Sequence, residues 1–379
     1  MEKVRSQLLE LVRCSSWGTE PSTALFDKEV DWRLLLNQAQ QQALLGQVYS
    51  QLEKLESRPE RNTMMQLHKL TTLNRKMYLK QLQVLDTITK RLQEGGIERP
   101  VLLKGVGVSS NYPDPGVRQC GDIDLYIGKA DYEKACEMAK GWSESVIESD
   151  SLSFKHYHFI FDGIPVELHR IVIQNNNIMR HSSQFSKWCI DQLEGQELRH
   201  ESIEGIEVYL PPYNFDAIYI FYHAWNHFCS YGIAFRQICD WCIYLDKYRD
   251  KIQQDKLVEQ LKYFGLTRPW NSFGQIATTL LGLDKSAIAA LGAPDQQLTD
   301  KVAERIWSGG NFGFYNGIHL GKGQSSILRR KFQNFFALFH SFAFLFTIDP
   351  LYSLNFLCRA PLQSIIGNIY QQYYTRTGK

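Results

Sequence analysis

Two aspartates in the stretch Gly121-Asp122-Ile123-Asp124-Leu125 have the spacing of side chains that share one face of a β-strand. Residues i and i+2 of a strand point to the same side. We therefore expect Asp122 and Asp124 to lie side by side, with the aliphatic residues between and after them turned into a core. Adjacent carboxylates repel each other unless a cation compensates, and oxygen ligands suit Mg²⁺ or Mn²⁺. The spacing indicates a carboxylate metal site.

A third carboxylate, Glu167, precedes His169 by two residues on a predicted hairpin strand. Three acids could hold two ions, and such a pair can activate an attacking hydroxyl and hold a leaving phosphate oxygen. Glu167 could also help to deprotonate the acceptor. His169 shares its face, where it could orient a carboxylate, touch a phosphate or make a structural hydrogen bond. His156 and His158 lie on the other hairpin strand, one face of which should be exposed.

Phosphate-binding groups are predicted just before the aspartates. Gly105 follows a short apolar run and can open a helix. Backbone N–H groups at a helix start can hold a triphosphate, and glycine allows close approach. Lys104 and Arg118 add positive charge for phosphate oxygens. Each feature alone is weak evidence for a nucleotide site. Their order along the chain is much more specific evidence.

These residues must be positioned by a small mixed α/β unit with the order β-α-β-α-β-β. Asp162-Gly163, between two β-rich runs, favours the positive φ angles of a type I′ hairpin turn. Hydrophobic residues at helical spacing predict helices before and after this unit. We expect an α+β protein with three parts: a helical region 1–96, an α/β core 97–210 and a helical domain 211–379.

Composition narrows the function classes. The 379 residues carry 42 Lys and Arg against 40 Asp and Glu, a net charge of +2, which argues against a long nucleic-acid partner. The 44% hydrophobic content excludes a disordered chain. The eight cysteines are scattered, the N-terminus lacks a signal-peptide core, and no long charge-free apolar stretch predicts a transmembrane segment. We expect a cytoplasmic protein.

The same motifs resemble the DNA polymerase beta-like nucleotidyltransferase superfamily, which has a glycine-rich helix start, a strand with Asp-x-Asp and a third acid on a later strand. Leu103-Lys-Gly, Tyr112-Pro-Asp-Pro-Gly-Val-Arg118, Gly121-Asp-Ile-Asp-Leu and Val166-Glu-Leu-His169 look closer still to its bacterial family of uncharacterised nucleotidyltransferases. The resemblance covers most of the chain. It implies a palm-like fold, with Asp122, Asp124 and Glu167 as catalytic metal ligands. It also implies nucleotide binding by Lys104, Gly105, Arg118 and Gly121.

The resemblance implies a reaction with two Mg²⁺ or Mn²⁺ ions. An NMP group would pass from an NTP, with ATP as the expected nucleotide, to a hydroxyl of a small molecule, a sugar or a protein, and pyrophosphate would leave. A protein-modifying enzyme that attaches AMP to a partner remains a variant of this reading. The alternative from another class is a non-catalytic nucleotide-binding or regulatory, antitoxin-like protein on the same fold.

Two further features lie in the C-terminal half. His223 and His227 are one helical turn apart, and with Arg236 and Asp240 they predict either a polar cluster on the acceptor side or a helix–helix contact. The aromatic segment 329–346 begins with three basic residues. It is predicted to be a buried helix of the C-terminal bundle, with membrane-surface contact as the alternative.

Overall fold

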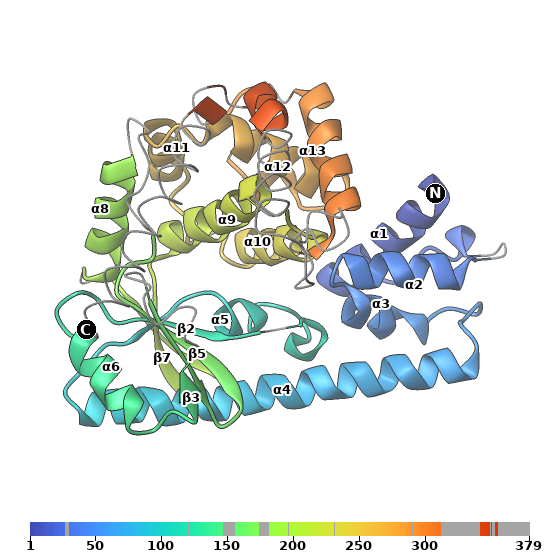
Figure 1. Ribbon diagram of the computed structural model, residues 1–379. Helices are drawn as coiled ribbons and strands as arrows, with labels where there is room; N and C mark the ends of the chain where they lie inside the picture. Colours follow the sequence, from blue (N-terminus) through green and yellow to red (C-terminus); the bar gives the residue numbers. More distant parts are fainter. Residues whose placement is uncertain are drawn as a thin grey trace, which may run out of the picture.

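The computed structural model shows an α+β protein in which helical segments flank a mixed sheet (Figure 1). The predicted fold class is confirmed. The structure describes residues 1–26, 30–119, 121–146, 156–173, 182–195, 197–230, 232–289, 291–293, 295–311, 342–348, 350 and 353–354.

The sheet has seven strands in the order β3-β4-β5-β2-β1-β7-β6. The strands are β1 (Val101–Leu102), β2 (Ile123–Tyr126), β3 (Ser145–Val146), β4 (His156–Phe161), β5 (Ile164–His169), β6 (Arg199–Ile203) and β7 (Ile206–Leu210). β2 is parallel to β5 and β1 is parallel to β7, whereas the other neighbouring pairs are antiparallel. The predicted strands and hairpin are found, and β3 and β6 are additions at the two edges.

Both long hairpins turn through residues with positive φ. Asp162 and Gly163, with φ of 48° and 70°, form the predicted turn between β4 and β5. Glu204 and Gly205, with φ of 49° and 83°, join β6 to β7 in the same way. The strand before Glu204 was missed because Arg-His-Glu-Ser-Ile contains no apolar run, although Glu-Gly was a usable turn signal.

One face of the sheet packs on α4 (Arg61–Glu94) and α6 (Tyr132–Lys140), and Figure 1 shows α4 running as a long rod past the strands. Ile123 and Leu125 point into this core, together with Leu85 and Ile88 of α4. Burying each of these side chains contributes about 1.5–3 kcal/mol. Since strand residues alternate, the residues between them face the other way, as predicted.

The remaining helices lie outside the layer formed by α4 and α6. They are α1 (Glu2–Trp17), α2 (Trp32–Gln41), α3 (Leu45–Leu52), α5 (Val106–Ser109), α8 (Ser182–Leu193), α9 (Tyr213–Ser230), α10 (Phe235–Lys247), α11 (Gln254–Tyr263), α12 (Thr267–Thr279) and α13 (Gln296–Gly309). Short 3₁₀ turns are η1 (Thr23–Leu25), η2 (Pro115–Val117) and η3 (Lys285–Ala287).

The N-terminal and C-terminal helices share one hydrophobic core. Polar contacts reinforce this link: Arg5 pairs with Glu304, and the Gln42 side-chain amide donates to the carbonyl oxygens of Ile306 and Trp307, both at 3.2 Å. The later part of α4, from Tyr78 to Leu92, belongs to the core of the sheet, whereas Leu67 near its start belongs to the shared helical core. The division at residues 96 and 210 therefore stays a prediction, because packing crosses both boundaries.

Among the described residues, no helix combines the length and apolar character that a membrane crossing requires. Most of the aromatic segment, residues 329–341, lies outside the described part of the chain, and residues 342–348 are helical.

Candidate active site

Acidic and histidine side chains line up across three neighbouring strands. The parallel pairing of β2 and β5 places Asp124 opposite Glu167. The antiparallel pairing of β4 and β5 places His158 opposite Glu167, and His156 opposite His169. Directly paired residues share a face of the sheet, so these five side chains gather on the face away from α4.

Asp124 is fully buried between a cation and an imidazole. Its Oδ1 lies 3.2 Å from Lys104 Nζ and 2.8 Å from His169 Nε2. Burial acts to raise the pKa of this carboxyl, but the Lys104 charge and the His169 contact outweigh burial and hold the pKa well below its ordinary value. Oδ2 is buried and has no hydrogen-bond partner within the described part of the chain. Asp124 is thus an ionised carboxylate with one oxygen available to a ligand.

The two other acids lie within the electrostatic reach of Asp124. Asp122 directly precedes β2, and the Asp124 charge together with burial raises its pKa. Glu167 Oε2 lies 3.2 Å from His169 Nε2. Burial acts to raise the pKa of Glu167, but the His169 contact reverses that effect and the pKa is lowered. Three mutually interacting carboxylates form a group that a divalent cation would stabilise.

A tight turn between β1 and α5 presents Lys104 to Asp124. Gly105 has φ 61° and ψ −122°, a conformation that favours glycine. Burial acts to lower the pKa of Lys104, but Asp124 outweighs it and raises that pKa. The Lys104 side chain is 19% exposed. Lys104 therefore brings a fixed positive charge to the edge of the acidic site.

A family model described as uncharacterised nucleotidyltransferase matches residues 28–282, about two thirds of the 379-residue chain. The chain belongs to this family. The matched segment contains the three carboxylates as well as Lys104 and Gly105. Comparisons with curated proteins and with solved structures gave no match. The protein is therefore a transferase of the nucleotidyltransferase class.

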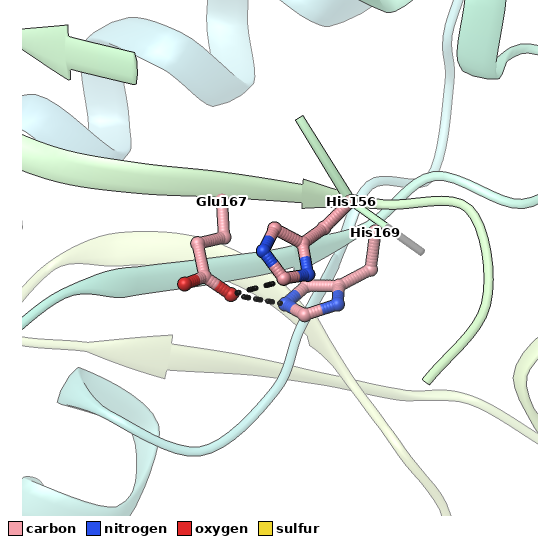
Figure 2. A group of neighbouring side chains, drawn as sticks. All are labelled: His156, Glu167 and His169. Carbon is pink, nitrogen blue, oxygen red and sulfur yellow. Dashed lines mark ion pairs between the residues drawn. The ribbon is translucent and has the colours of Figure 1, made fainter. Parts of the chain in front are cut away.

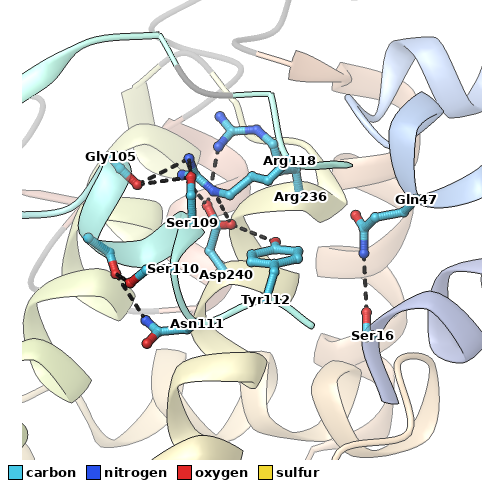
Figure 3. Close-up of polar contacts among 11 residues, drawn as sticks. Ser16, Gln47, Gly105, Ser109, Ser110, Asn111, Tyr112, Arg118, Arg236 and Asp240 are labelled. Atoms are coloured by element: carbon cyan, nitrogen blue, oxygen red, sulfur yellow. Dashed lines mark hydrogen bonds and ion pairs between the residues drawn. The ribbon is translucent and has the colours of Figure 1, made fainter. Parts of the chain in front are cut away.

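Arg118, predicted to hold phosphates, is a buried residue of this nucleotidyltransferase (Figure 3). Its Nε and Nη2 donate to the two carboxylate oxygens of Asp240 at 2.7 and 2.9 Å. Its Nη1 donates to Ser109 Oγ at 2.9 Å and to the Gly105 carbonyl at 3.3 Å. These contacts tie the glycine turn and α5 to α10, which favours a positioning role. Phosphate binding by Arg118 stays a prediction.

Asp240 collects two more donors from the same region (Figure 3). The Tyr112 hydroxyl donates to Oδ1 at 2.7 Å, and Arg236 Nη1 donates to Oδ2 at 3.2 Å. Burial acts to raise the pKa of Asp240, but Arg118 and Arg236 outweigh it and the pKa is lowered. Two roles were predicted for Arg236 and Asp240: a place on the acceptor side or a structural contact between elements. Their hydrogen bonds favour the structural contact.

Helix α9 brings a polar stripe to the acidic site. Tyr219, His223 and His227 follow one another at four-residue spacing, so they share a helix face. The charge of His223 contributes to the low pKa of Asp124. Burial raises the pKa of Tyr219, the Lys104 charge acts to lower it, and the Asp124 charge adds to the rise. The rings of His223 and His227 are 4.4 Å apart between centroids. His223 is therefore near the acids, and Tyr219 is a neighbour that sequence reasoning missed.

His156, Glu167 and His169 each offer one potential ligand atom, and these atoms lie within 4.8 Å of one another (Figure 2). The sequence placed both hairpin histidines on a half-exposed strand without assigning them to the site. A usable signal existed, because a two-residue turn at 162–163 pairs 161 with 164 and therefore His156 with His169.

Gly121 directly precedes Asp122 of the acidic site. A Cβ added to it would meet no other atom within 4 Å, so packing does not require glycine there. Nucleotide binding by Gly121 stays a prediction.

Proposed function

We propose that this protein transfers an NMP group from an NTP to a hydroxyl acceptor in a metal-dependent reaction and releases pyrophosphate. The observation that carries the proposal is the pairing of Asp124 with Glu167 across β2 and β5, with Asp122 beside them, in a chain of a nucleotidyltransferase family. This pairing supports the resemblance to the three-acid pattern of the polymerase beta-like superfamily.

The acidic cluster fits divalent cations. Asp124 Oδ2 is a buried oxygen with no hydrogen-bond partner in the described part of the chain, and the neighbouring Asp122 carboxylate raises the cost of leaving the pair uncompensated. We assign Asp122, Asp124 and Glu167 as the residues that would hold two Mg²⁺ or Mn²⁺ ions. When bound, such ions neutralise phosphate charge and favour the ionised form of an attacking hydroxyl.

The nucleotide would lie with its phosphates between the acids and the turn at Gly105. Lys104 supplies a positive charge next to Asp124. Gly121 has open space where a side chain would start, which allows close approach of a ligand. Lys104, Gly105 and Gly121 form the proposed nucleotide-binding set, and Arg118 supports it through its hydrogen bond to the Gly105 carbonyl.

The reaction is a substitution at phosphorus. The acceptor oxygen forms a bond to the α-phosphorus, and the bond between that phosphorus and the oxygen of the leaving pyrophosphate breaks. The hydroxyl proton passes to the carboxylate cluster. We place the acceptor toward α9, because His223 lies within electrostatic reach of Asp124 from that helix.

Isotope transfer from NTP labelled at either the α- or the γ-phosphate tests the proposal. The full-length protein, with Mg²⁺ or Mn²⁺, would be incubated with an acceptor collection of alcohols, sugars, small metabolites and a protein extract. The expected result is metal-dependent transfer of the α-label together with pyrophosphate release, both lost in a variant carrying Asp122→Asn and Asp124→Asn.

Other outcomes discriminate among the alternatives. Transfer of the γ-label would identify a kinase, and α-label transfer that persists in the double variant would show that these acids are not catalytic. Calorimetry that shows NTP binding without turnover across the whole collection would favour the non-catalytic nucleotide-binding protein. Labelled protein bands would point to modification of a protein acceptor.

A further inference from the structure

Two histidines, His156 and His169, lie beside the acidic site and are not part of the three-carboxylate pattern. His156 comes from β4, whereas Glu167 and His169 come from β5, and the register pairs His156 directly with His169. Figure 2 shows both imidazoles turned toward the same carboxylate. Two nitrogens and one oxygen are thus presented from two paired strands, a rigid arrangement for ligands.

The separations are those of ligands around a single ion. Glu167 Oε2 lies 3.2 Å from His169 Nε2 and 3.9 Å from His156 Nδ1. Metal–nitrogen and metal–oxygen bonds of about 2.1 Å place neighbouring ligand atoms about 3.0–3.4 Å apart in octahedral or tetrahedral geometry. The closer pair matches this spacing, and the His156 nitrogen lies about half an ångström beyond it.

The surroundings of the cluster supply a further oxygen. Asp124 Oδ1 is 2.8 Å from the same His169 nitrogen, so it can act as a fourth ligand. The side chains of His156 and Glu167 are 15% and 17% exposed, whereas His169 is fully buried. The cluster is therefore anchored on its inner side and accessible on its outer side.

We propose that His156, Glu167 and His169 bind one divalent transition ion of the class Mn²⁺, Co²⁺ or Zn²⁺ in preference to Mg²⁺. Imidazole nitrogen suits these borderline ions, whereas Mg²⁺ favours oxygen ligands and keeps several of its waters. The location beside the acids rests on the proposed function. The ligand set itself does not, because it follows from the geometry of β4 and β5.

This site would give the nucleotidyltransferase two kinds of metal position. Asp122 and Asp124 offer oxygen only, whereas Glu167 has one oxygen facing the imidazoles and stands next to Asp124 in the sheet. Glu167 would connect the two positions. The choice of metal would then depend on two histidines that the carboxylate pattern leaves out.

Co²⁺ is the first probe, because its visible absorption reports ligand type and number. The metal-free full-length protein would be titrated with Co²⁺, and then Co²⁺ would be displaced with Zn²⁺ or Mg²⁺. We expect one equivalent to bind with a visible band that Zn²⁺ abolishes and equimolar Mg²⁺ does not. His156→Asn and His169→Gln should each weaken Co²⁺ binding by about tenfold or more.

The matched control is His200→Asn, because His200 lies on edge strand β6 with a half-exposed side chain and should not affect Co²⁺ binding. Urea denaturation would verify that each variant folds. Pulsed EPR of the Mn²⁺-loaded protein gives an independent readout, and we expect nitrogen coupling from directly bound imidazole. If His169→Gln does not fold, His156→Asn and the EPR spectrum decide.

Unchanged Co²⁺ affinity in a folded histidine variant, or Mn²⁺ without nitrogen coupling, would overturn the proposal. Asp122→Asn separates it from the proposed function: we expect loss of α-label transfer with the Co²⁺ band retained. If the wild-type protein transfers no nucleotide while the histidine variants lose Co²⁺, the metal site stands and the proposed function fails.

Discussion

Arg118 and Asp240 form a buried, two-bond ion pair between residues 122 positions apart in the chain. The pair connects the turn at Gly105, which Arg118 also contacts, to helix α10. A charge at this depth is stable only with its partner. The geometry of the glycine turn near the acids therefore depends on a residue in a distant helix.

Replacing Asp240 with alanine should destabilise the fold strongly. Removal of one partner from a buried ion pair leaves the other charge uncompensated, at a cost of about 3–5 kcal/mol. The control is Asp86→Ala, which removes the partner of Lys90 on the exposed surface of α4 and should cost less than about 1 kcal/mol. Urea denaturation followed by circular dichroism measures both changes. Equal losses in the two variants would contradict the role assigned to Asp240.

The ion pair of Asp240 with Arg118 should also make the stability of the fold depend on pH. The pKa of Asp240 is below its ordinary value of 3.8, so its carboxylate stabilises the fold above that pH, and this contribution is lost as the pH falls through the lowered value. We expect the difference in free energy of unfolding between the wild type and Asp240→Asn to be constant from pH 7 to about pH 5. It should shrink below that range. A difference that grows on acidification would reverse the assigned sign.

The two glycines beside the site should respond differently to alanine. Gly105→Ala forces a side chain into φ 61°, ψ −122°, and should cost about 1–3 kcal/mol of stability. Gly121→Ala meets open space and should leave the unfolding midpoint unchanged while raising KM for the NTP. Denaturation curves and steady-state kinetics measure these effects. An unchanged KM in Gly121→Ala would remove Gly121 from the nucleotide-binding set.

Lys104→Met should weaken use of the nucleotide. One charge-assisted hydrogen bond to a phosphate contributes about 1.5–3 kcal/mol, so kcat/KM for the NTP should fall by roughly 10- to 100-fold. Lys80→Met is the control, because Lys80 pairs with Asp162 at an exposed hairpin turn. Transfer of the α-label at varied NTP concentration measures both. A loss in Lys80→Met as large as that in Lys104→Met would show that the effect is not local to the site.

Several parts of the fold follow from short-range physics. The alternation of Asp122, Ile123, Asp124 and Leu125 predicts which side chains face the core, and the structure confirms that Ile123 and Leu125 do. The turn at Asp162-Gly163 likewise predicts the β4–β5 hairpin. The short edge strand β3 and the polar strand β6 were missed, because neither contains an apolar run.

The sequence by itself determined the residue types of the acidic site, their order and the hairpin whose two-residue turn places His156 opposite His169. These properties depend on neighbours a few residues apart, where strand alternation and turn geometry act. The tertiary structure decided that Asp124 stands opposite Glu167, because the register of parallel strands is set by packing across intervening helices. It also decided that Arg118 pairs with Asp240, since only the folded core removes water from both charges and makes each depend on the other.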